Sequence, residues 1–178
     1  MAGLLRRARR MATQPLAPHR GAGVILGIGL GGFADGIGLH QIAQWHNMAS
    51  AVVPPTTMDA MRLNMMWDGF FHAATWAITL AGVFVLLADA RRGRRTPSPI
   101  AFTGQLLLGW GLFNLVEGII DHHVLNLHHV RDMPVHVPVY DWVFLLVGGI
   151  GFSVIGWALS KHRDPDRHPG FVAADSIQ

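Results

Sequence analysis

Four long apolar stretches alternate with short polar segments along the chain. A bilayer core about 30 Å thick requires roughly 20 mainly apolar residues in each helix that crosses it. The stretches have that length and run over residues 23–45, 69–88, 100–120 and 139–159. Two prolines lie in the segment after the first stretch and two in the segment after the third, where they favour a stop. The pattern therefore predicts an all-α fold, a four-helix transmembrane bundle.

The first stretch has one alternative interpretation, as a signal peptide, because a basic N-terminal segment precedes it. We reject this alternative for three reasons. The stretch is long and rich in glycine, Asp35 and His40 interrupt it, and no small-residue cleavage motif follows it.

The basic residues predict the orientation, because Lys and Arg in short loops favour the cytoplasmic side. The segments after the first and third stretches hold one arginine each, Arg62 and Arg131. All other basic residues fall in the remaining segments: Arg6, Arg7, Arg9, Arg10, Arg20, Arg91, Arg92, Arg94, Arg95, Lys161, Arg163 and Arg167. We therefore expect both termini in the cytoplasm, with a basic tail over residues 1–20, a membrane domain over 21–162 and a polar tail over 163–178.

Composition agrees with a membrane protein and narrows the chemistry. Hydrophobic residues make up 51% of the chain and charged residues 14%, against about 25% charged in a typical soluble domain. The lipid bilayer is thus the expected partner, and the basic blocks indicate topology rather than nucleic-acid binding. The chain has no Cys, which excludes disulfides and thiolate ligands. Any metal must be held by nitrogen and oxygen.

Ionisable residues of the membrane domain gather at the ends of the stretches that are predicted to face outward. The set comprises Asp35, His40, His46, Asp68, His72, Glu117, Asp121, His122, His123, His128, His129 and Asp141. Asp68 and His72 are four residues apart and share a helix face, as do Glu117 and Asp121. Such groups inside a membrane cost several kcal/mol unless they are paired, so they indicate function.

Imidazoles and carboxylates at helical spacing suit a divalent transition metal, namely iron, zinc, manganese or copper. We expect a metal site built from the following residues, with the carboxylates as ligands or as partners that orient the imidazoles. They are His40, Asp68, His72, Glu117, Asp121, His122 and His128. His46, His123 and His129 are weaker members.

Several of these residues also have structural explanations. Asp68 and Asp141 could each be a helix N-cap. His46, His128 and His129 could be solvated at the interface, and His136 is assigned no role. The central polar residues could form a buried hydrogen-bond network that holds the bundle together.

Three functions remain open, and so does the question of whether the protein is an enzyme. The first is a redox or hydrolytic metalloprotein at the outer face. The second is the binding, delivery or transport of a metal ion, although the inner halves of the helices offer little polar pathway. The third is a b-type haem protein with two axial imidazoles. The absence of a C-x-x-C-H motif excludes covalent haem.

Glycines recur every four residues in the first stretch, at Gly23, Gly27 and Gly31, and again at Gly32 and Gly36. Small residues at this spacing let helix backbones approach closely. The stripes predict tight packing within the chain, and a homodimer is an alternative use of the same faces.

Three segments resemble those of one bacterial family of predicted membrane proteins, domain of unknown function 2243. They are GLGGFADGIGLHQIAQWHNM, WDGFFHAATW and FNLVEGIIDHHVLNLHHV, and the resemblance covers all four stretches. It implies a four-span protein of the bacterial inner membrane and no particular activity. The residues that match its motifs are Asp35, His40, His46, Asp68, His72, Glu117, Asp121, His122, His123, His128 and His129.

Overall fold

The computed structural model describes residues 21–94 and 96–162, and this part of the chain is helical. The two predicted tails, together with Arg20, Arg95, Arg163 and Arg167, lie outside the described residues. In chain order the elements are α2 (Ala22–Asp35), η1 (Gly36–Ile42), α3 (Met58–Arg91), α4 (Pro99–Glu117), η2 (Gly118–Val124), α5 (Pro138–Val143), η3 (Phe144–Gly151) and α6 (Phe152–Ser160). The η segments are π-helical continuations of the α-helices beside them.

Four continuous helices are long and apolar enough to cross a membrane, which confirms the four predicted spans. They are Ala22–Ile42, Met58–Arg91, Pro99–Val124 and Pro138–Ser160. The second begins well before the predicted residue 69, because Thr57 caps it: its side chain accepts a hydrogen bond from the backbone N–H of Ala60 at 3.2 Å. Asp68 therefore lies inside α3, and its interpretation as an N-cap was wrong.

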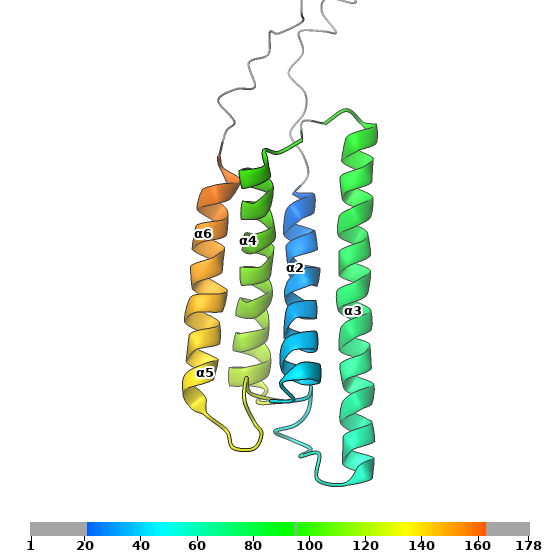
Figure 1. Ribbon diagram of the computed structural model, residues 1–178, viewed down its shortest axis with the longest axis vertical. Helices are drawn as coiled ribbons and strands as arrows, with labels where there is room; N and C mark the ends of the chain where they lie inside the picture. Colours follow the sequence, from blue (N-terminus) through cyan, green and yellow to red (C-terminus); the bar gives the residue numbers. More distant parts are fainter. Residues whose placement is uncertain (1–20, 95, 163–178) are drawn as a thin grey trace, which may run out of the picture.

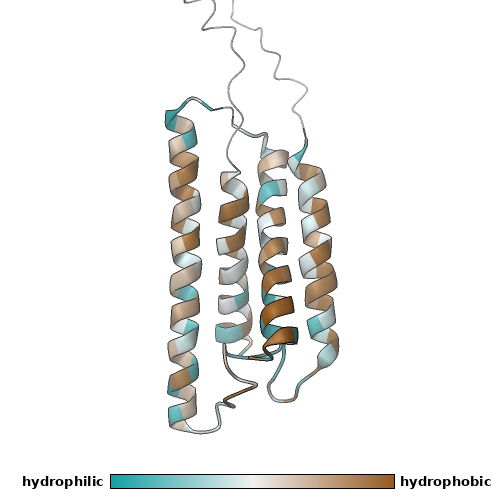
Figure 2. Cartoon of the chain, turned by 180° about the vertical axis from the view of Figure 1, so that it is seen from behind, coloured by the Kyte–Doolittle hydropathy of each residue, from teal (hydrophilic) through white to brown (hydrophobic). Residues whose placement is uncertain are grey.

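The four spans stand in a row (Figure 1). α2 and α4 occupy the centre, α3 packs on the outer side of α2, and α6 packs on the outer side of α4. The expected four-helix bundle is thus replaced by an open arrangement, in which α3 and α6 are the two edges. Large apolar side chains are exposed along both edge helices, for example Trp76, Phe84, Val154 and Trp157. Figure 2 shows mostly apolar ribbon along the spans, as lipid contact requires.

The glycine stripes allow the central helices to touch at backbone distance. A Cβ added at Gly27 would collide with the carbonyl oxygen of Leu106 in α4, and one added at Gly109 would collide with that of Val24 in α2. The two contacts are equivalent, because Gly27 and Val24 of α2 correspond to Gly109 and Leu106 of α4. Reciprocal contacts of this kind occur at an interface between two equivalent subunits. These stripes therefore serve packing within the chain, and a homodimer through them stays a prediction.

The paired contacts reflect an internal repeat in which residues of α2, η1 and the loop that follows have counterparts 82 positions later, for example Leu26 and Leu108. The outer helices pack in the same way at a shorter offset, because Gly82 of α3 packs on Leu26 and Gly156 of α6 packs on Leu108. The protein is thus two helical hairpins, related by a pseudo-two-fold axis that runs between α2 and α4. Because α2 and α4 meet at this axis, α3 and α6 lie on opposite outer sides, and the four spans form a row.

Candidate metal centre

The repeat places the same two irregular features at the ends of α2 and α4. Each helix widens into a π-segment, at Gly36 in the first half and at Gly118 in the second. Each chain then turns through a residue with a left-handed backbone, Gln44 (φ 51°) and Asn126 (φ 50°). These loops, residues 43–57 and 125–137, lie at the same end of the row (Figure 1).

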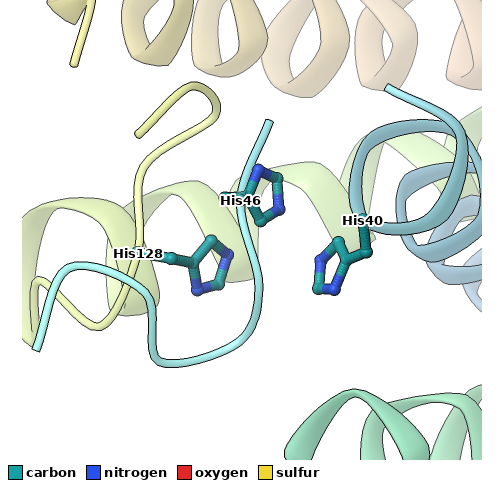
Figure 3. A group of neighbouring side chains, drawn as sticks. All are labelled: His40, His46 and His128. Carbon is teal, nitrogen blue, oxygen red and sulfur yellow. The ribbon is translucent and has the colours of Figure 1, made fainter. Parts of the chain in front are cut away.

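Four buried imidazoles meet where the two loops fold back under the helix ends. His40 and His122 come from the π-segments, whereas His46 and His128 come from the loops. All four are at most 2% exposed. The ring centroids of His40 and His46 are 4.3 Å apart, those of His46 and His128 4.6 Å, and those of His122 and His128 4.8 Å. Figure 3 shows three of these rings, drawn from three separate segments of chain.

Two buried carboxylates complete the cluster, Asp35 from the first half and its counterpart Glu117 from the second. Oδ2 of Asp35 lies 3.0 Å from Nε2 of His40 and 3.8 Å from Nε2 of His46. Oε1 of Glu117 lies 3.6 Å from Nε2 of His128. The two carboxylates also interact with one another. We call Asp35, His40, His46, Glu117, His122 and His128 the central cluster.

In each loop imidazole, Nδ1 is hydrogen-bonded to a backbone carbonyl of the opposite half of the protein. Nδ1 of His46 contacts the carbonyl oxygen of Val130 at 2.9 Å, and Nδ1 of His128 contacts that of Met48 at 3.3 Å. A carbonyl oxygen can only accept, so each Nδ1 carries the proton and donates it. In the neutral form of each ring the lone pair is then on Nε2, the nitrogen that is directed into the cluster.

Two further aspartates hold the imidazoles of the π-segments. Asp68 on α3 lies 3.0 Å from Nδ1 of His40 and also accepts from the backbone N–H of Met48 at 2.9 Å. Asp141 on α5 lies 3.6 Å from Nδ1 of His122 and accepts from the backbone N–H of Val130 at 2.8 Å. Asp68 is hydrogen-bonded to its imidazole, whereas Asp141 lies beside His122 without a hydrogen bond to it. Neither aspartate is an N-cap, because Thr57 and Val137 hold those positions.

The atoms that face the middle of the cluster have no hydrogen-bond partner among the described residues. They are Oδ2 of Asp35, Nε2 of His40, Nε2 of His46, Nε2 of His128, both carboxylate oxygens of Glu117 and Nε2 of His122, and the first two of these atoms lie 3.0 Å from one another as an ion-pair contact. Buried polar atoms are rarely left unpaired, because each costs about 1–3 kcal/mol. Burial, together with the neighbouring His46, holds the pKa of His128 well below its usual range, so that ring is neutral. Buried imidazoles and carboxylates arranged in this way could hold a metal ion.

The structure brings some of the predicted site residues together and separates others. The central cluster contains four of them: His40, Glu117, His122 and His128. Asp68 lies outside the cluster and is hydrogen-bonded to His40. His72 and Asp121 lie outside: Nδ1 of His72 bonds to the carbonyl of Asp68 at 2.7 Å, within its own helix, and Asp121 is only half-buried.

Two members of the central cluster were underrated from the sequence. Asp35 was named among the polar residues but not as a ligand, and His46 was ranked as a weaker member, with solvation as the alternative, although it is fully buried. The signal that could have identified them is the repeat. Asp35, His40 and His46 align with Glu117, His122 and His128 at one constant offset.

A third group of candidate ligands lies nearer the surface, where the two halves differ. His129 and His136 stack with centroids 4.0 Å apart, and a nitrogen of each lies 3.2 Å from Oδ2 of Asp141. In the first half the corresponding place is taken by Asn47, which donates to Asp68 at 2.7 Å. This outer triad of His129, His136 and Asp141 is a second possible site, and His136 had been assigned no role.

Two openings reach the central cluster. A groove of about 310 Å³ lies between α2, α4 and η3, and is lined by apolar side chains together with Asp35 and Asn114. A second pocket of about 290 Å³ opens among the loops and reaches His40 and Asp68. The first is apolar and lies along the spans, and the second is more polar and lies at their end.

Comparison with known proteins leads to a family rather than to a relative of known activity. No curated protein and no solved structure matches the chain. Residues 22–163 match the family described as "Predicted membrane protein (DUF2243)", which covers the four spans and the loops that carry the central cluster. The resemblance inferred from the motifs is therefore confirmed, and the chain belongs to this family of predicted membrane proteins.

Proposed function

We propose that this protein is a membrane metalloprotein that holds divalent transition metal in the central cluster. The observation that carries the proposal is the set of buried, unpartnered nitrogen and oxygen atoms that converge from both halves. Ligand atoms bound at 2.0–2.2 Å to one ion stand about 3–3.5 Å apart at tetrahedral or octahedral angles. The distances of 3.0, 3.6 and 3.8 Å between carboxylate oxygens and ring nitrogens are close to that spacing.

Charge supports the same proposal. Two ionised carboxylates side by side in a buried place repel one another unless a cation or a shared proton lies between them. Asp35 and Glu117 are 5% and 4% exposed, and within residues 21–94 and 96–162 no Lys or Arg is buried. A divalent cation would balance both carboxylates and would occupy the free lone pairs of the imidazoles. Mixed imidazole and carboxylate ligands suit iron, manganese or zinc better than copper.

The competing functions fit this geometry less well. A b-type haem needs a flat slot between its two axial imidazoles, but neighbouring rings among the four are packed at centroid distances below 5 Å with almost no exposure.

Transport across the bilayer needs polar groups along the whole path. Within residues 21–94 and 96–162, the remaining buried charged residue is Asp89 at the opposite end, which is paired with Arg94 at 3.2 Å.

The test is the metal content of the protein purified in mild detergent, before and after incubation with Fe²⁺, Mn²⁺ or Zn²⁺ and removal of free metal. We expect the wild-type chain to retain metal and His128→Ala to lose most of it. His72→Ala is the matched control, because His72 lies at the same end of the protein but outside the cluster. Folding of each variant is checked by size exclusion and circular dichroism. A folded wild-type chain that retains no metal would overturn the proposal.

A second candidate function, chemistry on a lipid-soluble molecule at this centre, is favoured by the groove between α2, α4 and η3. Its walls include Trp110, Phe144 and Val147, and Asp35 of the central cluster lines it. Asn114 in the same groove is 4% exposed, and its Oδ1 has no partner among the described residues. A hydrophobic substrate with a polar head could thus reach the cluster from the bilayer.

Binding of a spin-labelled fatty acid tests this second function. Val147→Trp fills the groove and should weaken binding at least several-fold. Val154→Trp, which is exposed on α6 outside the groove, is the control. Equal binding by both variants would exclude the groove as the entry.

A further inference from the structure

The repeat bears on how many ions the central cluster holds. It supplies two equivalent ligand sets, Asp35, His40 and His46 from the first half and Glu117, His122 and His128 from the second. A single ion that engaged both sets completely would need six ligands, drawn from both halves. We propose that the centre is dinuclear, with one ion held by each set. This inference rests on the proposed function and deepens it.

The distances within each half support one ion per set. In the first half, Oδ2 of Asp35 is 3.0 Å from one ring nitrogen and 3.8 Å from the other. In the second half, Oε1 of Glu117 is 3.6 Å from Nε2 of His128. Each half thus places a carboxylate beside imidazoles at a spacing that one ion can span.

The ring distances show where the two sets meet and where they separate. Rings within a half have centroids 4.3 Å and 4.8 Å apart. Between the halves, His46 and His128 are in contact at 4.6 Å, whereas His40 and His128 are 6.0 Å apart and His46 and His122 are 6.4 Å apart. Two-metal centres place their ions about 3.5–4 Å apart. Asp35 and Glu117 are counterparts in the repeat and interact with one another, so a group that bridges the two ions would lie beside them.

Each set also has its own support. His40 is oriented by Asp68, and its counterpart His122 faces Asp141. Each loop imidazole is oriented by a backbone carbonyl of the other half: His46 by Val130, and His128 by Met48. Such partners fix the ring and raise the basicity of the ligand. The ligands are duplicated at one constant offset, and in each half an aspartate lies beside the imidazole of the π-segment, which is what one ion per half requires.

The experiment is a titration of the metal-stripped full chain with Co²⁺ in mild detergent, read by its visible absorption and by equilibrium dialysis. It is made in the His136→Ala background, because the outer triad could take an additional ion. We expect two bound equivalents per chain. His40→Ala should bind one, through the second half, and His122→Ala should bind one, through the first half.

A second readout tests whether the two ions are neighbours. With two equivalents of Mn²⁺, we expect an exchange-coupled electron paramagnetic resonance spectrum, which becomes the spectrum of an isolated ion in His40→Ala. One equivalent in the parent chain, lost completely in both variants, would overturn the dinuclear assignment and leave a mononuclear centre. No bound metal in any folded chain would instead overturn the proposed function itself.

Discussion

His46 and His128 stack on one another across the pseudo-two-fold axis, with ring centroids 4.6 Å apart and planes inclined by 16°. The two residues are 82 positions apart, and each is anchored through Nδ1 to a carbonyl of the other half. Neither hairpin could position its loop imidazole alone. The centre is therefore a property of the joined halves, and the predictions below follow from that dependence.

Removal of the carboxylate behind His40 should weaken metal binding without removing a central ligand. Asp68→Ala deprives Nδ1 of His40 of its partner and frees the loop at Met48. Loss of such a partner typically costs about 10–100-fold in metal affinity. Competition with a chelator of known affinity measures the change. Asp59→Ala is the matched control, because Asp59 is an exposed aspartate on the same helix. Equal affinities for the two variants would contradict the orienting role of Asp68.

Metal should stabilise the folded protein, because an ion that binds the native state alone shifts unfolding by mass action. At a free metal concentration 100 times the dissociation constant, the free energy of unfolding should rise by about 2.7 kcal/mol. Thermal unfolding in detergent, followed with and without a chelator, measures the effect. In His128→Ala the midpoint should no longer respond to metal. A wild-type midpoint that ignores metal would count against the site.

Backbone contact between the halves should tolerate no added side chain. Gly27→Ala places a methyl group against the carbonyl of Leu106, which cannot move aside as a flexible side chain could. Overpacking of this kind costs about 1–3 kcal/mol, and the loss should appear as a lower unfolding midpoint. Gly69→Ala is the control, since nothing lies within 4 Å of its added Cβ. If both variants unfold alike, the close approach of α2 and α4 is not required.

The orientation predicted from the basic residues can be tested by cysteine labelling, because the chain has no Cys of its own. Thr56→Cys and Arg92→Cys place single exposed thiols at opposite ends of α3. We expect an impermeant maleimide to label Thr56→Cys on intact cells and Arg92→Cys only after permeabilisation. The reverse pattern would place the central cluster on the cytoplasmic side.

The sequence by itself determined the four spans and the end at which the polar residues gather. Span length and hydropathy suffice for the first, because lipid leaves the backbone few options besides a helix. The second follows from position along each span, which does not depend on how the helices pack. For the same reason His40, Glu117, His122 and His128 could be named as candidates before any contact was known.

The tertiary structure decided which side chains meet. A uniform helical phase of about 100° per residue places His40 and His46 on different faces, but the π-segment at Gly36 and the left-handed turn at Gln44 bring their rings together. Asp35 becomes a candidate ligand only because the joined halves bury it beside Glu117. His72, which shares a helix face with Asp68, bonds instead to the backbone carbonyl of Asp68 within its own helix. A cluster built across a pseudo-two-fold axis depends on contacts between residues far apart in the chain, and local spacing does not contain them.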